Sequence, residues 1–334
     1  MTFSSWLQRQ WWHPTPASWP LVPLGLFYCG IASVRRWCYQ IGIFRVRRVA
    51  VPVIIVGNIT VGGSGKTPLV AWLAQHLSAQ GLRPGIISRG YGGRVSKGPI
   101  QVKPGHSPRE VGDEPVLLAR RSHCPVAVGK DRHAAARFLI STQQCNVIIA
   151  DDGLQHYSLH RDIEIEMLDG DRRHGNGRCL PAGPLREPRR RAKLVDIHVC
   201  NGPPRENEIG MNLRATEAIQ LSSDIQRRPL NSFQGQTVHA IAGIGNPRHF
   251  FDMLEQQGIR IIEHPFDDHF AYRAVDINFG DDHPVLMTEK DAVKCEKWAG
   301  PHHWYVPVEA EPDPALIELL RHRLQDDING QKAT

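Results

Sequence analysis

Short apolar runs and amphipathic segments alternate along most of the chain. The runs VPVIIV (51–56) and NVIIA (146–150) are rich in β-branched residues, which is typical of strands buried in a parallel sheet. Between such runs, apolar residues recur three or four positions apart, as in 69–80, and this spacing predicts helices that pack on a sheet. The alternation therefore predicts an α/β fold with helices on both faces of the sheet.

A second unit of the same kind follows Gly235. Its segments predict a strand with a glycine turn, a helix with an Asn cap and a Gly stop, two strands, the start of a helix and a final amphipathic helix: 237–245, 246–258, 259–264, 284–288, 289–294 and 313–324. We expect a second, smaller α/β/α domain after a break near 225–236, which gives domain limits of 36–230 and 231–334. The Gly-x-Gly at 243–245 is only a weak indication of a second nucleotide site.

The first 50 residues have a composition of their own. They contain no Asp or Glu, five of the eight Trp (Trp6, Trp11, Trp12, Trp19 and Trp37) and six Arg (Arg9, Arg35, Arg36, Arg45, Arg47 and Arg48). Their apolar stretch, 17–34, is barely as long as the shortest spanning helix of about 17 residues, and Pro20 and Pro23 interrupt it. Trp prefers the headgroup level and Arg is attracted to anionic lipid. Residues 1–35 are therefore predicted to form a helix-containing anchor that lies in a membrane surface. A core helix and a transmembrane helix are the alternatives.

A glycine-rich segment, GNITVGGSGKTP (57–68), separates the first strand from a helix, which is the context of a phosphate-binding P-loop. Its glycines let backbone N–H groups turn towards phosphate oxygens, and the helix N-terminus adds partial positive charge. Lys66 would reach the β- and γ-phosphates of a nucleotide, and Thr67 would bind Mg²⁺. The predicted nucleotide-binding residues are Thr60, Val61, Gly62, Gly63, Ser64, Gly65, Lys66 and Thr67. Thr60 stands where the pattern GxxxxGK[ST] has Gly.

The strand at 146–150 runs directly into Asp151 and Asp152. An apolar strand that ends in acidic residues is typical of the element that supplies a carboxylate to the metal beside a P-loop. The alternative is a solvated Asp pair in the turn before Gly153. With the P-loop present, we predict that both carboxylates serve a Mg²⁺ ion and that the first domain is a P-loop NTPase-like α/β/α sandwich.

Two further polar segments carry candidate acid–base groups. VGDEP (111–115) contains Asp113, which could take the proton of a phosphoryl acceptor or could cap the helix that follows. FDDHF (266–270) places His269 in a polar loop, where a structural role is the simpler interpretation.

The charge balance points to an anionic partner. The chain has 334 residues, enough for two domains, and its 22% of charged residues is ordinary for a globular protein. Its net charge of +6 suits an anionic ligand or surface. Between Arg172 and Lys193 there are eight basic residues opposed only by Glu187. Pro and Gly deny this stretch a long helix, and it lacks the interleaved aromatic residues of single-strand nucleic-acid binders. A membrane surface or a phosphorylated substrate is therefore favoured over nucleic acid.

Taken in order, these segments resemble the tetraacyldisaccharide 4'-kinases of lipid A synthesis. The similarity covers about residues 51–294 and includes the basic, apolar N-terminus; its strings are GNITVGGSGKTP, ISRGYGG, VGDEP, DDGLQH, LPAGPLREP, AGIGNP, the Asp268–His269 pair and MTEKDAVK. The resemblance implies transfer of the γ-phosphate of ATP to the 4'-hydroxyl of a tetraacylated disaccharide 1-phosphate. It also implies ATP and Mg²⁺ as cofactors, and a location at the cytoplasmic face of the inner membrane. We expect a monomer.

The same resemblance implies roles for individual residues. Ser64, Lys66 and Thr67 would hold ATP and Mg²⁺, and Asp151 and Asp152 would serve the metal. Asp113 would be the base and His269 would orient it, while Arg186 and Arg132 would face phosphate. The family's FPDH string is FDDH here, so Asp267 departs from the pattern next to His269.

Two other functions remain open from the residues alone. A soluble small-molecule kinase would not need the Trp- and Arg-rich N-terminus. A P-loop switch or metallochaperone NTPase would hydrolyse nucleotide without an acceptor and would leave the basic stretch unexplained.

Overall fold

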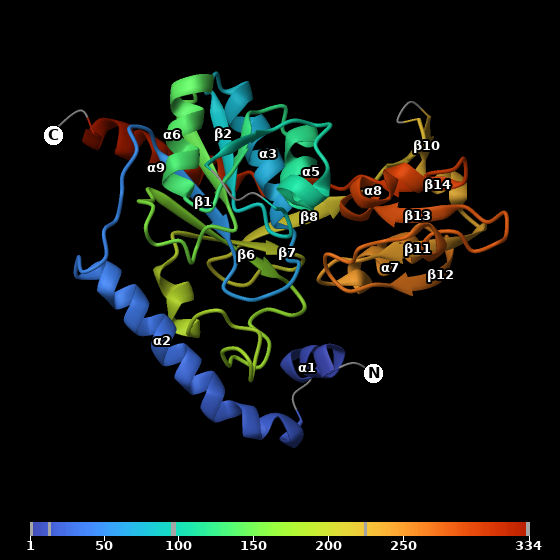
Figure 1. Ribbon diagram of the computed structural model, residues 1–334, viewed down its shortest axis with the longest axis horizontal. Helices are drawn as coiled ribbons and strands as arrows, with labels where there is room; N and C mark the ends of the chain where they lie inside the picture. Colours follow the sequence, from blue (N-terminus) through green and yellow to red (C-terminus); the bar gives the residue numbers. More distant parts are fainter. Residues whose placement is uncertain (1–2, 13–14, 95–97, 224–225, 332–334) are drawn as a thin grey trace.

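Two β-sheets lie side by side, each with helices on its faces (Figure 1). The computed structural model describes residues 3–12, 15–94, 98–223 and 226–331. Its α-helices are α1 (Phe3–Trp12), α2 (Val22–Gln40), α3 (Lys66–Ala79), α4 (Pro108–Val111), α5 (Asp113–Arg121), α6 (Arg132–Gln143), α7 (Pro247–Gln256), α8 (Glu289–Cys295) and α9 (Ala315–Gln331). Short 3₁₀ helices are η1 (Pro16–Leu21), η2 (Arg189–Leu194), η3 (Leu230–Phe233), η4 (Ala274–Asp276) and η5 (Glu296–Trp298).

The described part of the first sheet has nine strands in the order β15-β8-β7-β6-β1-β5-β2-β4-β3. Neighbours are parallel except at the two edges, where β3 and β15 run antiparallel. The strands are β1 (Val53–Gly57), β2 (Pro84–Ser88), β3 (Ile100–Val102), β4 (Val126–Val128), β5 (Val147–Asp151), β6 (Ile163–Asp169), β7 (Ile197–Asn201), β8 (Ile209–Arg214) and β15 (Glu309–Pro312). The parallel centre brings the carboxyl ends of β1 and β5 to one edge.

The run at 51–56 is apolar throughout because both faces of β1 are covered. Ile54 and Val56 belong to the core shared with α3, α5 and α9. Val53 and Ile55 belong to the core on the opposite face, which α6 covers. Successive strand side chains point to opposite faces, so a strand buried on both sides needs a continuous apolar sequence. The prediction of a buried parallel strand is confirmed.

The described part of the second sheet has six strands in the order β10-β9-β14-β13-β11-β12. These are β9 (Glu217–Gln220), β10 (Arg227–Pro229), β11 (Thr237–Ala242), β12 (Arg260–Pro265), β13 (Val285–Thr288) and β14 (His303–Val306). The helix α7 covers one face through Phe250, Phe251 and Leu254. Ala292 and Cys295 of α8 cover the other face. The mixed α/β fold with two sheets agrees with the expectation.

The sheets divide the chain differently from the predicted limits of 36–230 and 231–334. The strands β9 and β10 precede residue 231 yet belong to the second sheet. At the other end, β15 pairs with β8, and Leu316, Leu320 and Leu324 of α9 complete the first core. The chain therefore enters the second sheet after β8 and returns to the first sheet after β14. Part of the predicted break, 224–225, lies outside the described residues.

The N-terminal segment forms an arm below the first sheet (Figure 1). Gly25 of α2 packs so closely on the 179–182 segment that a Cβ there would lie 2.9 Å from the Cβ of Ala182. Twelve large apolar residues between 19 and 46 are exposed: Trp19, Leu24, Leu26, Phe27, Tyr28, Ile31, Val34, Trp37, Ile41, Ile43, Phe44 and Val46. No helix in the described part of the chain is both long enough and apolar enough to cross a bilayer.

Candidate active site

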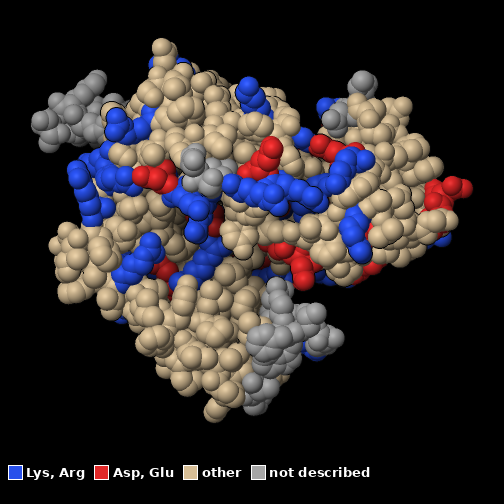
Figure 2. Space-filling view, in the orientation of Figure 1, with Lys and Arg blue, Asp and Glu red and all other residues tan. Residues whose placement is uncertain are grey.

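A cleft of about 1380 Å³ lies where the two sheets and α2 meet. Its walls include the P-loop segment 61–67 and Tyr28 and Ile31 of α2. The second domain contributes Ile244, which follows β11, and His269, which follows β12. Lys and Arg side chains form a band across this hollowed face (Figure 2). The basic residues that line the cleft are Arg35, Lys66, Arg89, Arg121, Lys130, Arg132, Arg186 and Lys290. A cleft of this charge suits phosphorylated ligands.

The loop between β1 and α3 contains two glycines in a backbone conformation that other residues rarely adopt. Gly62 (φ +104°) and Gly65 (φ +91°) have positive φ, which glycine adopts without steric cost. The Lys66 ammonium donates a hydrogen bond to Asn58 Oδ1 (3.0 Å), and the Asn58 amide donates to the Gly62 carbonyl (3.2 Å). Asn58 is fully buried and therefore fixes both the lysine and the loop. We did not single out Asn58 from the sequence, although it directly follows the strand.

Thr60, the departure from the glycine pattern, has a structural reason. It forms a β-bridge with Leu185, and the neighbouring Val61 N–H donates to the Pro184 carbonyl (2.9 Å). Thr60 does not have a positive φ. A β-branched residue suits such an extended position, so glycine is not required there.

Asp151 and Asp152 end β5 beside the P-loop, as predicted, but their surroundings differ. Asp151 is buried; its Oδ2 accepts a hydrogen bond from Ser88 (3.3 Å), whereas Oδ1 has no partner among the described residues. Burial, together with the charges of Glu114 and Asp152, raises the pKa of Asp151 to about 7. Burial would raise the pKa of Asp152 as well, but the charges of Lys66 and Arg186 outweigh it and lower that pKa.

The two arginines predicted to face phosphate both contact Asp152. Arg186 pairs with its carboxylate (2.7 Å to Oδ2), and Lys66 lies 3.7 Å from Oδ1. The buried Arg132, first residue of α6, donates to the Asp152 carbonyl (2.9 Å). Its Nη1 is buried without a partner among the described residues. Arg186 contacts this acid through Nη1, and both arginines line the cleft.

Asp113 and His269 meet across the two halves of the molecule. The His269 Nδ1–H donates to Asp113 Oδ2 (3.0 Å). Gly112 is the N-cap of α5 and Asp113 is its first residue, so the alternative of an Asp113 cap is wrong. Burial would raise the pKa of Asp113, but the His269 hydrogen bond and the Lys290 charge lower it to about 2. The same hydrogen bond raises the pKa of His269.

Only one member of this pair faces the cleft directly. His269 lines the cleft, whereas Asp113 lies behind it and is buried. His269 has a positive φ of +62°, and Tyr91 packs against its ring with the centroids 5.0 Å apart. Asp268 pairs with Lys290 (3.0 Å), which also pairs with Glu114 (2.9 Å). The change at Asp267 therefore leaves His269 in contact with Asp113.

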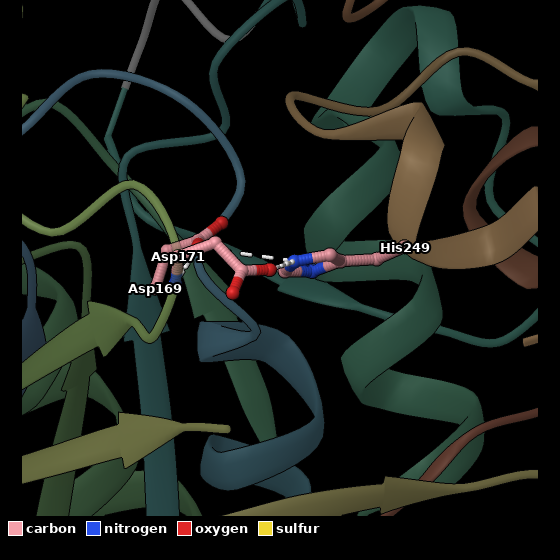
Figure 3. Close-up of side chains that lie close together, drawn as sticks. All are labelled: Asp169, Asp171 and His249. Carbon is pink, nitrogen blue, oxygen red and sulfur yellow. Dashed lines mark hydrogen bonds and ion pairs between the residues drawn. The ribbon is translucent and has the colours of Figure 1, made fainter. Parts of the chain in front are cut away.

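A third polar group joins the two halves, and we did not predict it. Figure 3 shows Asp169 and Asp171, from the end of β6, opposite His249 of α7. His249 Nε2 lies 3.0 Å from Asp171 Oδ2. Asp169 already accepts hydrogen bonds from the backbone of Asp171 (3.0 Å) and from the amide of Asn246 (3.1 Å). These contacts connect the end of β6 to α7 and its N-cap, so the group is an inter-domain contact.

Three of the seven arginines of the 172–193 stretch have acidic partners from elsewhere in the chain; one of them is Arg186, which pairs with Asp152. Arg173 pairs with Glu208, and Arg191 pairs with Glu164. The sequence showed only Glu187 as an opposing charge because the other acids are distant along the chain. This stretch is therefore less free to bind an anion than its composition predicted.

Comparison with known proteins agrees with this geometry. The family described as Tetraacyldisaccharide-1-P 4'-kinase (LpxK) matches residues 17–325. The chain belongs to this kinase family. The Tetraacyldisaccharide 4'-kinase of Nitrosococcus oceani is 50% identical over 332 residues, 98% of each chain. That of Alkalilimnicola ehrlichii is 51% identical over 323 residues, 96% of this chain and 95% of the other.

The family's fold is also present. A crystal structure described as the "apo" form of LpxK from Aquifex aeolicus in complex with ATP is similar with a TM-score of 0.75. It is 30% identical in sequence, and the match covers 92% of this chain and 99% of that one. The resemblance to the tetraacyldisaccharide 4'-kinases inferred from the sequence strings is confirmed.

Proposed function

We propose that this chain transfers the γ-phosphate of ATP to the 4'-hydroxyl of a tetraacyldisaccharide 1-phosphate and so forms lipid IVA. Its family membership supports this reaction. One observation carries it further: a single cleft is lined by the phosphate-binding loop, by His269 and by apolar side chains of α2. A nucleotide, a hydroxyl and an acyl chain could all meet there.

On the nucleotide side, Lys66 and the 60–67 backbone would hold the phosphates of ATP. In P-loop enzymes the lysine neutralises charge on the transferred group, and the protein otherwise acts mainly by positioning it. Asn58 keeps the Lys66 ammonium within reach of the loop. ATP in the related Aquifex aeolicus structure supports this assignment.

The residues beside the loop suit a Mg²⁺ ion. Asp151 offers a buried oxygen without a partner, and its raised pKa reflects a negative charge that is poorly compensated. A divalent ion prefers such oxygens and would supply charge neutralisation at the phosphates. Thr67 and Asp151 would hold the ion. Asp152 is already paired with Arg186 and lies near Lys66, so it would lie beside the ion without holding it directly.

On the acceptor side, we propose the Asp113–His269 pair as the proton acceptor. The predicted order, with Asp113 as the base and His269 orienting it, stays a prediction. In the present conformation His269 is partly exposed, whereas Asp113, its hydrogen-bond partner, is buried. Asp113 would then hold the imidazole and stabilise its protonated form, as a buried carboxylate does for a catalytic histidine.

We propose both predicted arginines as ligands of a substrate phosphate, because both line the cleft. Arg186 also holds the Asp152 carboxylate through Nη1. Arg132 holds the Asp152 carbonyl through Nη2.

The exposed apolar side chains of α2 support a peripheral membrane anchor. In Figure 2 the lower part of the molecule, where α2 lies, carries few charged side chains. The nearby Arg36, Arg45 and Arg48 suit an anionic lipid surface. We propose that residues 1–35, extended by α2 to Gln40, lie at the cytoplasmic face of the inner membrane, and that the protein acts as a monomer.

The deciding experiment offers labelled ATP and Mg²⁺ with the disaccharide lipid, with its deacylated sugar, or with no acceptor. We expect a bis-phosphorylated lipid from the first mixture only, and none from Lys66→Ala. Rapid ATP hydrolysis without lipid product would favour an NTPase switch. Equal phosphorylation of the deacylated sugar would favour a soluble small-molecule kinase.

A further inference from the structure

The turn that precedes α7 touches the P-loop itself. A Cβ placed on Gly245 would lie 2.7 Å from the carbonyl carbon of Gly62 and would overlap the amide nitrogen of Gly63. A Cβ on Gly63 would in turn lie 3.2 Å from the Gly245 nitrogen. Backbone of the second sheet's domain therefore lies directly on the first half of the phosphate-binding loop. Only glycine at 245 permits this approach, and a side chain at 63 would make it tighter.

The conformation of the turn does not itself explain the glycine at 245. Gly245 is not among the glycines with positive φ. The three atoms nearest to its missing Cβ all belong to Gly62 and Gly63. The requirement for glycine therefore comes from the other domain.

Polar residues at the end of β6 and just after it hold the turn against the first domain. Arg172 donates a hydrogen bond to the Gly245 carbonyl. Asn246 donates to Asp169 (3.1 Å), and His249 contacts Asp171, as Figure 3 shows for the latter pair. These contacts fix the position of Gly245 relative to the P-loop.

The second domain holds the same turn from behind. The Gly243 N–H donates to Asp291 Oδ2 (2.7 Å), and the Thr288 hydroxyl donates to the same oxygen (2.6 Å). Asp291 is completely buried, so this carboxylate is a rigid support. A displacement of the second domain therefore moves the turn with it.

We propose that Gly245 is a positioning residue for the P-loop, so that nucleotide affinity depends on docking of the second domain. The 243–246 turn braces Gly62 and Gly63 in the conformation that presents their N–H groups to phosphate. This inference rests on the proposed role of the P-loop in ATP binding. It assigns the weak Gly-x-Gly at 243–245 to support of the nucleotide site rather than to a second one.

The test is Gly245→Ala, with Gly105→Ala as the matched control. A Cβ on Gly105 meets no heavy atom within 4 Å, and Gly105 has no positive φ. We expect Gly245→Ala to raise the Kd for ATP, measured by calorimetry, by about tenfold or more, the equivalent of ~1.4 kcal/mol. Hydrogen exchange of the 60–67 amides should become faster in the nucleotide-free protein. The control should match wild type in both measurements.

A second variant keeps the test decisive if Gly245→Ala does not fold. His249→Ala removes the contact with Asp171 at a partly exposed site, and should raise the ATP Kd in the same direction by a smaller factor. A folded Gly245→Ala protein with wild-type affinity and wild-type exchange would overturn the inference. So would wild-type affinity in His249→Ala if the glycine variant is unfolded. Absence of ATP binding by the wild-type protein would instead refute the proposed function.

Discussion

At the residue scale, the proposed chemistry depends on side chains that are far apart in the chain. His269 and Asp113 are 156 positions apart, and their contact is at the boundary between the two halves of the molecule. By contrast, Asn58, Ser64 and Lys66 form a local group within one loop. The first contact joins residues of two domains, whereas the second lies within one strand–loop–helix unit.

The pH dependence of kcat/KM should identify the base. If His269 takes the proton, the rate should fall as the pH drops through its raised pKa, above the ordinary value of 6.5. Asp113→Asn should move that limb to lower pH, because the hydrogen bond that raises the pKa is weakened. If Asp113 with its pKa of about 2 is the base, no acid limb should appear between pH 5 and 8.

Substitution of the pair should also separate catalysis from nucleotide binding. His269→Ala and Asp113→Ala should each lower kcat by roughly 10²–10⁴-fold, the range for loss of a general base. The ATP Kd should stay within about twofold of wild type, a change of less than ~0.5 kcal/mol. A large loss of ATP affinity would assign the pair to nucleotide binding.

Asn58→Ala tests the residue that the sequence did not reveal. Its loss leaves the Lys66 ammonium without its oxygen acceptor, and hydrogen bonds to charged groups contribute roughly 1.5–3 kcal/mol. We expect kcat/KM for ATP to fall roughly 10- to 100-fold. Asn278→Ala, at an exposed site in the second domain, is the control. An unchanged rate would show that Lys66 is positioned without Asn58.

The position of the P-loop between a strand and a helix could be predicted, because its residues are consecutive in the sequence. The contacts of Asp152 could not, since Arg186 and Arg132 reach this acid from different segments. Their role as phosphate ligands stays a prediction. His269 was connected to Asp113 only through family resemblance. Local sequence carries no signal for such a tertiary pair, and Asp169 and His249 were missed for the same reason.

At the element scale, strands buried on both faces were the most predictable part of the fold. β1 is apolar throughout, and β5 is apolar up to Asp151, so their composition indicates burial on both faces. The edge strand β15 has the polar sequence EAEP and gave no such signal. Its pairing with β8 depends on backbone hydrogen bonds, which almost any sequence can make.

The strand β6 contains an ion-pair group that should make stability depend on pH. Glu166 is fully buried and accepts hydrogen bonds from His174 (3.0 Å) and His198 (2.9 Å). Burial would raise the pKa of Glu166, but these two bonds lower it. A lowered folded-state pKa stabilises the protein above the ordinary value of 4.5, and this contribution is lost as the pH falls through the folded-state pKa.

Glu166→Gln should therefore be destabilising near pH 7, by roughly 1–3 kcal/mol in urea unfolding. The difference from wild type should shrink as the pH falls below 4.5, because the carboxylate then takes up a proton in the unfolded chain before it does so in the folded protein. Glu311→Gln, at an exposed pair with Arg214, is the control and should change little. A difference that stays constant between pH 7 and 4 would contradict the charge-based explanation.

At the scale of the whole molecule, the arm formed by α2 connects the cleft to an apolar surface. Tyr28 and Ile31 line the cleft, while Leu26 and Phe27 are exposed on the same helix. An acyl chain could thus reach the cleft along α2 without crossing water. The composition of the first 50 residues predicted the surface, but not that the same helix would form a wall of the cleft.

Phe27→Glu should release the protein from vesicles. Phe27 is 70% exposed, so the change should affect lipid contact and leave the fold intact. We expect cosedimentation with phosphatidylglycerol vesicles to fall strongly, while the affinity for ATP, measured without vesicles, is retained. Leu319→Glu, at an exposed position of α9, is the matched control. Unchanged cosedimentation of Phe27→Glu would argue against α2 as the anchor.

The return of β15 and α9 to the first sheet also determines when the first domain can complete its fold during synthesis of the chain. A ribosome makes these elements after the entire second domain. Domains tend to fold as units from the N-terminus while the chain emerges. Here the first domain must wait, because Leu316, Leu320 and Leu324 belong to its core and β15 covers the edge of β8. A nascent chain that stops before β15 therefore exposes an unpaired sheet edge and an incomplete core, and the first domain can be assembled only once β15 and α9 have been made.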